Sequence, residues 1–199
     1  LARKDAKKIV KNGIEIISHR GIDGKSFYDS DGISFGHALH SVVGSIVQPI
    51  VKGDFVFGAN CEIYNWKELK RECGLKSEND SELMLDVLIS HLDGIPAEDI
   101  DQKIIDEIFR LFDGVYAFFL YCKKFDYLLL GRDVLGEKPI WFNNSSGLVF
   151  ASEGKALIRQ GIYAEELAPR NIIVYQTKSE EMRFIRQRFL KADMGDAVF

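Results

Sequence analysis

The sequence predicts an α+β fold, arranged as a four-layer α/β/β/α sandwich. The middle of the chain carries helical patterns, and apolar runs of strand length lie on either side of them. Short connections separate the runs that follow the helices, which favours antiparallel pairing. These runs are almost continuously apolar, which indicates strands that are covered on both faces. Two packed sheets with helices outside them satisfy all three observations.

Four segments carry helical patterns, with apolar residues recurring at helical spacing. Two of them begin with a capping box, in which an N-cap side chain and a Glu three residues later satisfy free N–H groups. The two capping pairs are Asn65 with Glu68 and Asn79 with Glu82. The predicted helices cover residues 4–17, 65–73, 81–92 and 101–112.

Six segments have the composition of strands, and the first two each open with Gly. Residues 18–26 are rich in Gly and Ser and predict a turn. Residues 152–153 are expected to begin a further helix, and Lys138-Pro139 to shape a turn between two strands. The predicted strands cover residues 32–39, 53–60, 114–123, 126–133, 138–143 and 147–152.

Composition excludes several classes of protein. The 199 residues suit one domain, and a hydrophobic content of 46% can fill a substantial core. The net charge of −4 comes from interspersed acids and bases, whereas a nucleic-acid surface would be basic and clustered. No apolar run reaches the roughly 18 residues of a membrane span, and no signal peptide is visible. The three cysteines lack CxxC spacing, so we expect no metal site and a cytoplasmic location.

The stretch FGANCEIYNWKEL, residues 57–69, runs from apolar strand residues directly into polar ones. Asn60 and Glu62 stand at the end of the predicted strand, with Cys61 between them. Burying such side chains in a hydrophobic core is unfavourable, because each needs a hydrogen-bond partner or solvent. The stretch therefore predicts a site for a polar ligand.

Seven motifs follow one another along nearly the whole chain. Their order and their residues resemble those of the glutaminase domain of asparagine synthetases, in particular of the archaeal branch. That domain is a class II glutamine amidotransferase with the N-terminal-nucleophile hydrolase fold, which is the fold that the resemblance implies here. The motifs are SHRGIDG, GHALHSVVGSIVQPI, ANCEIYNWKEL, ENDSELML, FDGVYAFFLY, LLLGRDVLGEKPIWF and FASEGKAL.

The resemblance implies a catalytic arrangement. In this family the thiolate of an N-terminal cysteine attacks the side-chain amide of glutamine, and its own α-amino group assists proton transfer. Asn60 and the backbone N–H of Cys61 match the two donors that stabilise the oxyanion of the tetrahedral intermediate. Arg20 matches an arginine near the nucleophile.

The resemblance also implies how glutamine is held. Glu62 and Asp80 match the carboxylates that bind its α-ammonium group. Leu39 stands where many relatives carry the Arg that binds the α-carboxylate. Backbone groups of Val42 and Val43, or a nearby cation, are expected to replace that Arg.

Cys61 stands where the family usually has Gly. If Asn60 and Glu62 share one face of an extended segment, the Cys61 side chain points to the other face. We interpret it as a small buried hydrophobic residue; a nucleophilic role for Cys61 is the alternative. The family's nucleophile is the first residue of the mature protein, but this sequence begins with Leu1. We expect several residues to precede Leu1 and the chain as written to hydrolyse no glutamine.

The resemblance sets the expected domain organisation and partners. Residues 1–190 form the glutaminase domain, lacking its N-terminal strand, and 191–199 begin the linker to a synthetase domain outside this chain. That domain would use ATP and Mg²⁺ to activate aspartate, whereas the glutaminase domain needs no cofactor or metal. A homodimer is left open. The alternative is a non-catalytic module of the same fold with a regulatory or assembly role, which Leu39 and the missing leading Cys favour.

Overall fold

The computed structural model describes residues 5–39 and 46–188, which form five α-helices, two 3-10 helices and eleven strands. The helices are α1 (Ala6–Ile16), α2 (Trp66–Glu72), α3 (Asp80–Leu92), α4 (Gln102–Phe109) and α5 (Lys155–Ile158), with the 3-10 helices η2 (Ser18–Arg20) and η3 (Ala97–Asp99). The strands are β1 (Gly24–Ser30), β2 (Ile33–Leu39), β3 (Ile50–Lys52), β4 (Phe55–Ile63), β5 (Gly114–Cys122), β6 (Tyr127–Arg132), β7 (Trp141–Asn143), β8 (Val149–Ala151), β9 (Glu165–Glu166), β10 (Asn171–Gln176) and β11 (Met182–Arg186).

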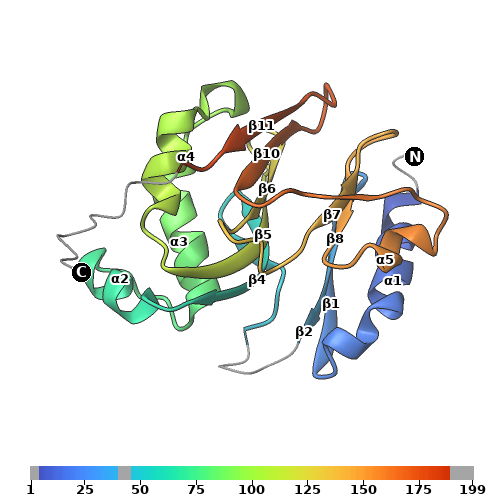
Figure 1. The fold of residues 1–199 in the computed structure, drawn as a ribbon, viewed down its shortest axis with the longest axis horizontal. Helices are drawn as coiled ribbons and strands as arrows, with labels where there is room; N and C mark the ends of the chain where they lie inside the picture. Colours follow the sequence, from blue (N-terminus) through green and yellow to red (C-terminus); the bar gives the residue numbers. More distant parts are fainter. Residues whose placement is uncertain (1–4, 40–45, 189–199) are drawn as a thin grey trace, which may run out of the picture.

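The elements stack in four layers, which confirms the predicted α/β/β/α sandwich (Figure 1). Helices α2, α3 and α4 lie outside a six-stranded sheet of order β11-β10-β6-β5-β4-β3. The second strand layer consists of two smaller sheets, β1-β2 and β8-β7-β9. Helices α1 and α5 lie outside that layer. All paired strands are antiparallel.

The side chains of strand β5 pack into two different hydrophobic cores, one on each face of the sheet. Its side chains alternate between the faces of the sheet, as the two-residue period of a strand requires. Tyr116, Phe118 and Leu120 join the core beneath α3 and α4. Phe119 and Tyr121 join the core between the two strand layers. Both faces are therefore buried, as the continuous apolar run predicted.

The predicted helices form, but one predicted cap is wrong. Asn79 caps α3 as expected, because its side-chain oxygen accepts a hydrogen bond from the Glu82 N–H at 2.8 Å. Helix α2 begins directly after Asn65, yet Asn65 makes no capping bond. Its amide instead donates to the Leu111 carbonyl at 2.9 Å and accepts from the Asp113 N–H at 3.1 Å. Asn65 thus ties the end of β4 to the loop before β5.

Several strands lie outside the predicted segments. Residues 18–26 were predicted as a turn, but they contain η2 and the start of β1. Strand β1 carries Lys, Ser and Asp, and it forms by pairing along its whole length with β2. Strands β3, β9, β10 and β11 were not predicted. In the described part of the chain, no helix is both long and apolar enough to cross a bilayer.

Candidate functional site

A cavity of about 1180 Å³ lies between the two strand layers. Its wall includes parts of α1, β2, β4, β5 and β8 and the first turn of α3. Most of the predicted site residues line this cavity, whereas Val42 and Val43 lie outside the described residues. The predicted residues in its wall are Arg20, Leu39, Asn60, Cys61, Glu62 and Asp80.

Strand alternation separates the three polar residues of β4. Val56 of this strand packs between the two strand layers, whereas Phe57 and Ala59 pack on the helix side. Asn60 and Glu62 therefore share the face of Val56, and Cys61 faces the helices.

The Cys61 thiol belongs to the packing beneath α3. Its Sγ lies 3.3 Å from the Ser81 Oγ, and its side chain packs against the apolar core on that side. Burial raises the pKa of the Cys61 thiol to about 12, and the nearby Asp80 carboxylate adds to the rise. A protonated thiol is a poor nucleophile, so this environment is consistent with the interpretation of Cys61 as a packing residue.

The backbone of Cys61 has a different environment from its side chain. In an antiparallel pair, residues that exchange hydrogen bonds alternate with residues that do not. The Tyr64 N–H donates to the Asp113 carbonyl at 2.7 Å, so the even-numbered residues of β4 bond to β5. Cys61 is opposite Tyr116 in the ladder. Instead of bonding to Cys61, Tyr116 donates its N–H to Asp133 Oδ2, and its carbonyl accepts from the Asp133 N–H.

The odd-numbered N–H groups of β4 therefore point to the other edge of the strand. Strand β3 pairs with β4 only as far as Phe57. The Ala59 N–H donates to Gln48 Oε1 at 2.6 Å, and the Ile63 N–H donates to Asp80 Oδ2 at 3.3 Å. Cys61 lies between them, and no acceptor for its N–H is found among residues 5–39 and 46–188. Within the described part of the chain, one backbone donor thus remains next to Asn60, as an oxyanion requires.

Two carboxylates flank this donor. Glu62 is largely exposed, and its Oε1 lies 2.7 Å from Lys138 Nζ. Asp80 begins α3 and accepts hydrogen bonds from the Ile63 N–H and from the Ser81 N–H. An acid in the first turn of a helix is favourable without any ligand, so Asp80 has a structural role whether or not it binds substrate.

Arg20 forms an ion pair with Glu153, just before α5. Its Nη1 lies 3.0 Å from Glu153 Oε1, and Lys155 Nζ lies 2.6 Å from Glu153 Oε2. Burial acts to raise the pKa of Glu153, but hydrogen bonds from Lys155 and Arg20 outweigh it and hold the pKa below its usual value. The carboxylate thus fixes Arg20 at the wall of the cavity.

Three further residues of the wall were not predicted as site residues. Gln48 is buried and supports β4 through the Ala59 N–H. Burial lowers the pKa of His37 despite a hydrogen bond with the Ala59 backbone, and no described residue pairs with its Nδ1. Lys138 was predicted only to shape a turn, although its ammonium group meets Glu62. The sequence offers no signal for this contact, because 76 residues separate the two.

The arrangement combines donors for an oxyanion with carboxylates for a cation. Such a site can bind a zwitterionic amide and stabilise charge on its carbonyl oxygen. Within the described ranges, no group of three His, Cys, Asp or Glu side chains is placed to hold a metal ion. The roles of the individual residues, and the expectation of no metal, stay predictions.

Comparison with known proteins gives the family. Residues 1–188 match the family model described as glutamine amidotransferase domain. A probable glutamine-hydrolysing asparagine synthetase from Dictyostelium discoideum is 24% identical over 204 residues, which cover 98% of this chain and 35% of that protein. Asparagine synthetase B from Escherichia coli is 29% identical over 169 residues, covering 78% and 28% of the two chains. This chain thus spans about a third of the length of these relatives.

A solved structure supports the same fold. The glutamine phosphoribosylpyrophosphate amidotransferase from Bacillus subtilis superposes with a TM-score of 0.73 at 18% identity, over 90% of this chain and 46% of that one. The fold is therefore that of the N-terminal-nucleophile hydrolases, whereas the archaeal assignment stays a prediction. Because the family model matches almost the full length of the chain, the chain belongs to the class II glutamine amidotransferase domain family and is related to the glutaminase domains of asparagine synthetases.

Proposed function

We propose that this chain is the ammonia-releasing domain of a glutamine-dependent asparagine synthetase. One observation carries the proposal. Asn60, Cys61, Glu62 and Asp80 all line the same cavity, and within residues 5–39 and 46–188 the Cys61 N–H has no acceptor. These are the groups that glutamine hydrolysis needs, namely two donors for an oxyanion and two acceptors for an ammonium group.

The chemistry assigns each group one task. A cysteine thiolate attacks the side-chain carbonyl carbon of glutamine, and the carbonyl oxygen becomes an oxyanion that accepts from Asn60 Nδ2 and the Cys61 N–H. Collapse of this intermediate breaks the C–N bond, and the protonated nitrogen leaves as ammonia. Water then attacks the thioester, which releases glutamate and restores the thiol.

None of the three cysteines within residues 1–199 suits the role of nucleophile. The Cys61 thiol has a raised pKa and packs beneath α3. Cys73 is exposed at the end of α2, away from the cavity wall. Cys122 is buried opposite Phe55, and burial raises its pKa as well. In this proposal the nucleophile is therefore a cysteine that precedes Leu1 in the mature protein.

The full reaction extends beyond this domain. The relatives are named as glutamine-hydrolysing asparagine synthetases, and this chain corresponds to about a third of their length. We assign aspartate, ATP and Mg²⁺ to a synthetase domain that follows this one, and ammonia to the transfer between the two. The glutaminase domain itself uses no cofactor in this proposal.

The test is steady-state kinetics of the complete gene product. Asn60→Ala should lower the glutaminase kcat by about 10²–10³-fold with little change in KM, because its donor acts mainly on the oxyanion. Asp80→Asn should mainly raise the KM for glutamine, because it holds a charge that is present throughout the reaction. Asn143→Ala, at the end of β7 and away from the cavity wall, is the matched control. Free ammonia should support asparagine synthesis in both site variants.

A non-catalytic module is the second candidate, and Leu39 favours it. This apolar residue lies in the cavity wall where charge would be useful for binding an amino acid. Absence of glutamine hydrolysis in the folded complete gene product would select this candidate. Hydrolysis that Cys61→Ala abolishes would instead assign the nucleophile to Cys61 and overturn the roles given above.

A further inference from the structure

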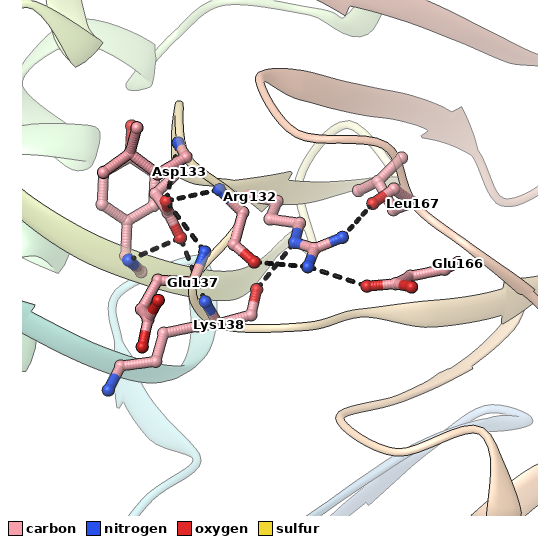
Figure 2. Close-up of polar contacts among 9 residues, drawn as sticks. Arg132, Asp133, Glu137, Lys138, Glu166 and Leu167 are labelled. Carbon is pink, nitrogen blue, oxygen red and sulfur yellow. Dashed lines mark hydrogen bonds and ion pairs between the residues drawn. The ribbon is translucent and has the colours of Figure 1, made fainter.

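Lys138 occupies a loop whose backbone is fixed by two buried charged side chains (Figure 2). The loop connects β6 to β7, and Arg132 and Asp133 at its start are 6% and 0% exposed. The Asp133 carboxylate accepts five backbone hydrogen bonds. Its Oδ1 accepts from the N–H groups of Leu135 at 3.0 Å, Gly136 at 2.7 Å and Glu137 at 3.2 Å, and its Oδ2 from those of Tyr116 at 3.3 Å and Lys138 at 3.2 Å.

Arg132 completes the loop's support from the other side. Its Nε donates to the Lys138 carbonyl at 2.9 Å, and its Nη1 donates to the Leu167 carbonyl at 2.6 Å. Its Nη2 lies 2.7 Å from Glu166 Oε1. The N–H and the carbonyl of Lys138 are thus each held by a buried charged group. Two fixed backbone bonds set the direction in which the Lys138 side chain leaves the loop.

The Lys138 side chain leads to the wall of the cavity. It is 19% exposed, and its Nζ lies 2.7 Å from Glu62 Oε1. Three cationic side chains contribute to the described wall, and the other two are Arg20 and Lys178. Arg20 pairs with Glu153, and Lys178 pairs with Asp126 at 2.5 Å. Of these three cations, Lys138 is the one paired with the carboxylate that adjoins the oxyanion donors.

We propose that Lys138 binds the α-carboxylate of glutamine while Glu62 binds its α-ammonium group, an inference that rests on the proposed function. An amino acid zwitterion carries both charges on substituents of one carbon atom. The Lys138–Glu62 pair presents the two opposite charges side by side, so the zwitterion can lie against it with each charge facing its counterpart. Leu39 supplies no charge to the wall, so the cation for the carboxylate comes from another element.

This arrangement also sets a competition. In the absence of substrate, Lys138 neutralises Glu62; when glutamine binds, each of the two side chains gains a contact of its own. A ligand that has the ammonium group but lacks the carboxylate would have to compete with Lys138 for Glu62. The pair therefore selects against amines and for amino acids with a free carboxylate.

The test compares L-glutamine with its α-amide, at a pH where the α-amine of both is protonated. The glutaminase activity of the complete gene product is measured for the wild type, Lys138→Met and Lys138→Arg. Lys178→Met is the matched control, because it removes the same charge from the same cavity. For glutamine, Lys138→Met should raise KM by about ten- to a hundredfold and leave kcat nearly unchanged, because the contact is the same in the ground and transition states.

The α-amide gives the opposite expectation. Its KM should be unchanged or lower in Lys138→Met, because Glu62 loses its competitor. Lys138→Arg should keep most of the affinity for glutamine, and Lys178→Met should match the wild type. An unchanged KM for glutamine in Lys138→Met, with an active wild type, would overturn this inference and leave the proposed function standing. A folded wild type that hydrolyses no glutamine would overturn both. If Lys138→Met does not fold, Lys138→Arg decides. A KM for glutamine in Lys138→Arg as high as the KM of the wild type for the α-amide would equally refute the assignment.

Discussion

Asp133→Asn tests how much the buried carboxylate contributes to the loop that carries Lys138. The substitution keeps the shape of the side chain but replaces one oxygen by an NH₂ group, which donates instead of accepting. The less costly orientation keeps the oxygen at Oδ1, where three N–H groups meet it. The NH₂ group then faces the N–H groups of Tyr116 and Lys138, and both lose their acceptor.

The magnitude follows from these two donors. A buried N–H that loses its acceptor costs about 1–3 kcal/mol, so the free energy of unfolding should fall by about 2–6 kcal/mol. Domains of this kind are stable by about 5–15 kcal/mol, so this loss is a large fraction of the total. The KM for glutamine should rise as well, because the amide side chain would leave the Lys138 N–H without its anchor.

Urea unfolding followed by circular dichroism measures the change. Asp99→Asn is the control, because Asp99 is exposed in η3; it should stay within about 0.5 kcal/mol of the wild type. A loss below about 1 kcal/mol in Asp133→Asn would refute the reasoning, since the loop would then not depend on the carboxylate.

Three further substitutions test the packing and the cavity wall. Gly131→Ala should destabilise by about 1–3 kcal/mol, because its Cβ would lie 2.1 Å from the ring of Phe118; Gly24→Ala, with no atom within 4 Å, is the control, and equal melting temperatures would contradict the prediction. Gln48→Ala should cost about 1–3 kcal/mol in a thermal melt, because the Ala59 N–H loses its acceptor; an unchanged melting temperature would exclude this role. Burial lowers the pKa of His37, so the unfolded chain takes up a proton at a pH where the folded chain does not. The free energy of unfolding should therefore fall as the pH drops below about 6.5, and His37→Gln should flatten this dependence in urea titrations at several pH values; an identical slope in both proteins would argue against the assignment.

Local signals were sufficient for the central elements of the fold. The apolar run of β5 and the apolar periodicity of α3 identify these elements without any knowledge of their neighbours. Strand β10 carries a comparable run, Ile172–Tyr175, so its absence from the prediction reflects an overlooked signal. Strand β1 is different, because its polar residues favour a turn, and pairing with β2 decides its conformation.

Asn65 shows the limit of a local rule. The capping-box pattern correctly marks the start of α2, but the side chain finds better partners 46 and 48 residues further along the chain. A pattern confined to four residues contains no information about the loop at Leu111 and Asp113.

The residue pattern itself points to the side chains of the candidate site, whereas its backbone donor was predicted only through the family resemblance. Polar residues at the end of an apolar strand identify Asn60 and Glu62 as candidates from the sequence alone. The available N–H of Cys61 depends on the register between β4 and β5, which no motif specifies. The contact of Lys138 with Glu62 depends on the path of the loop that follows β6.

The edge of β4 beyond β3 also bears on how the protein avoids association. An exposed strand edge is a template for another strand, because it offers a regular row of donors and acceptors. Here Gln48 and Asp80 already accept from the N–H groups of Ala59 and Ile63. An incoming strand would have to displace a buried amide and a helix-terminal carboxylate before a second ladder bond could form. Among the residues that the structure describes, the Cys61 N–H is then an isolated donor. One such donor can bind a single oxygen atom but cannot start a ladder, so the features that leave Cys61 available to a small molecule also protect this edge against aggregation.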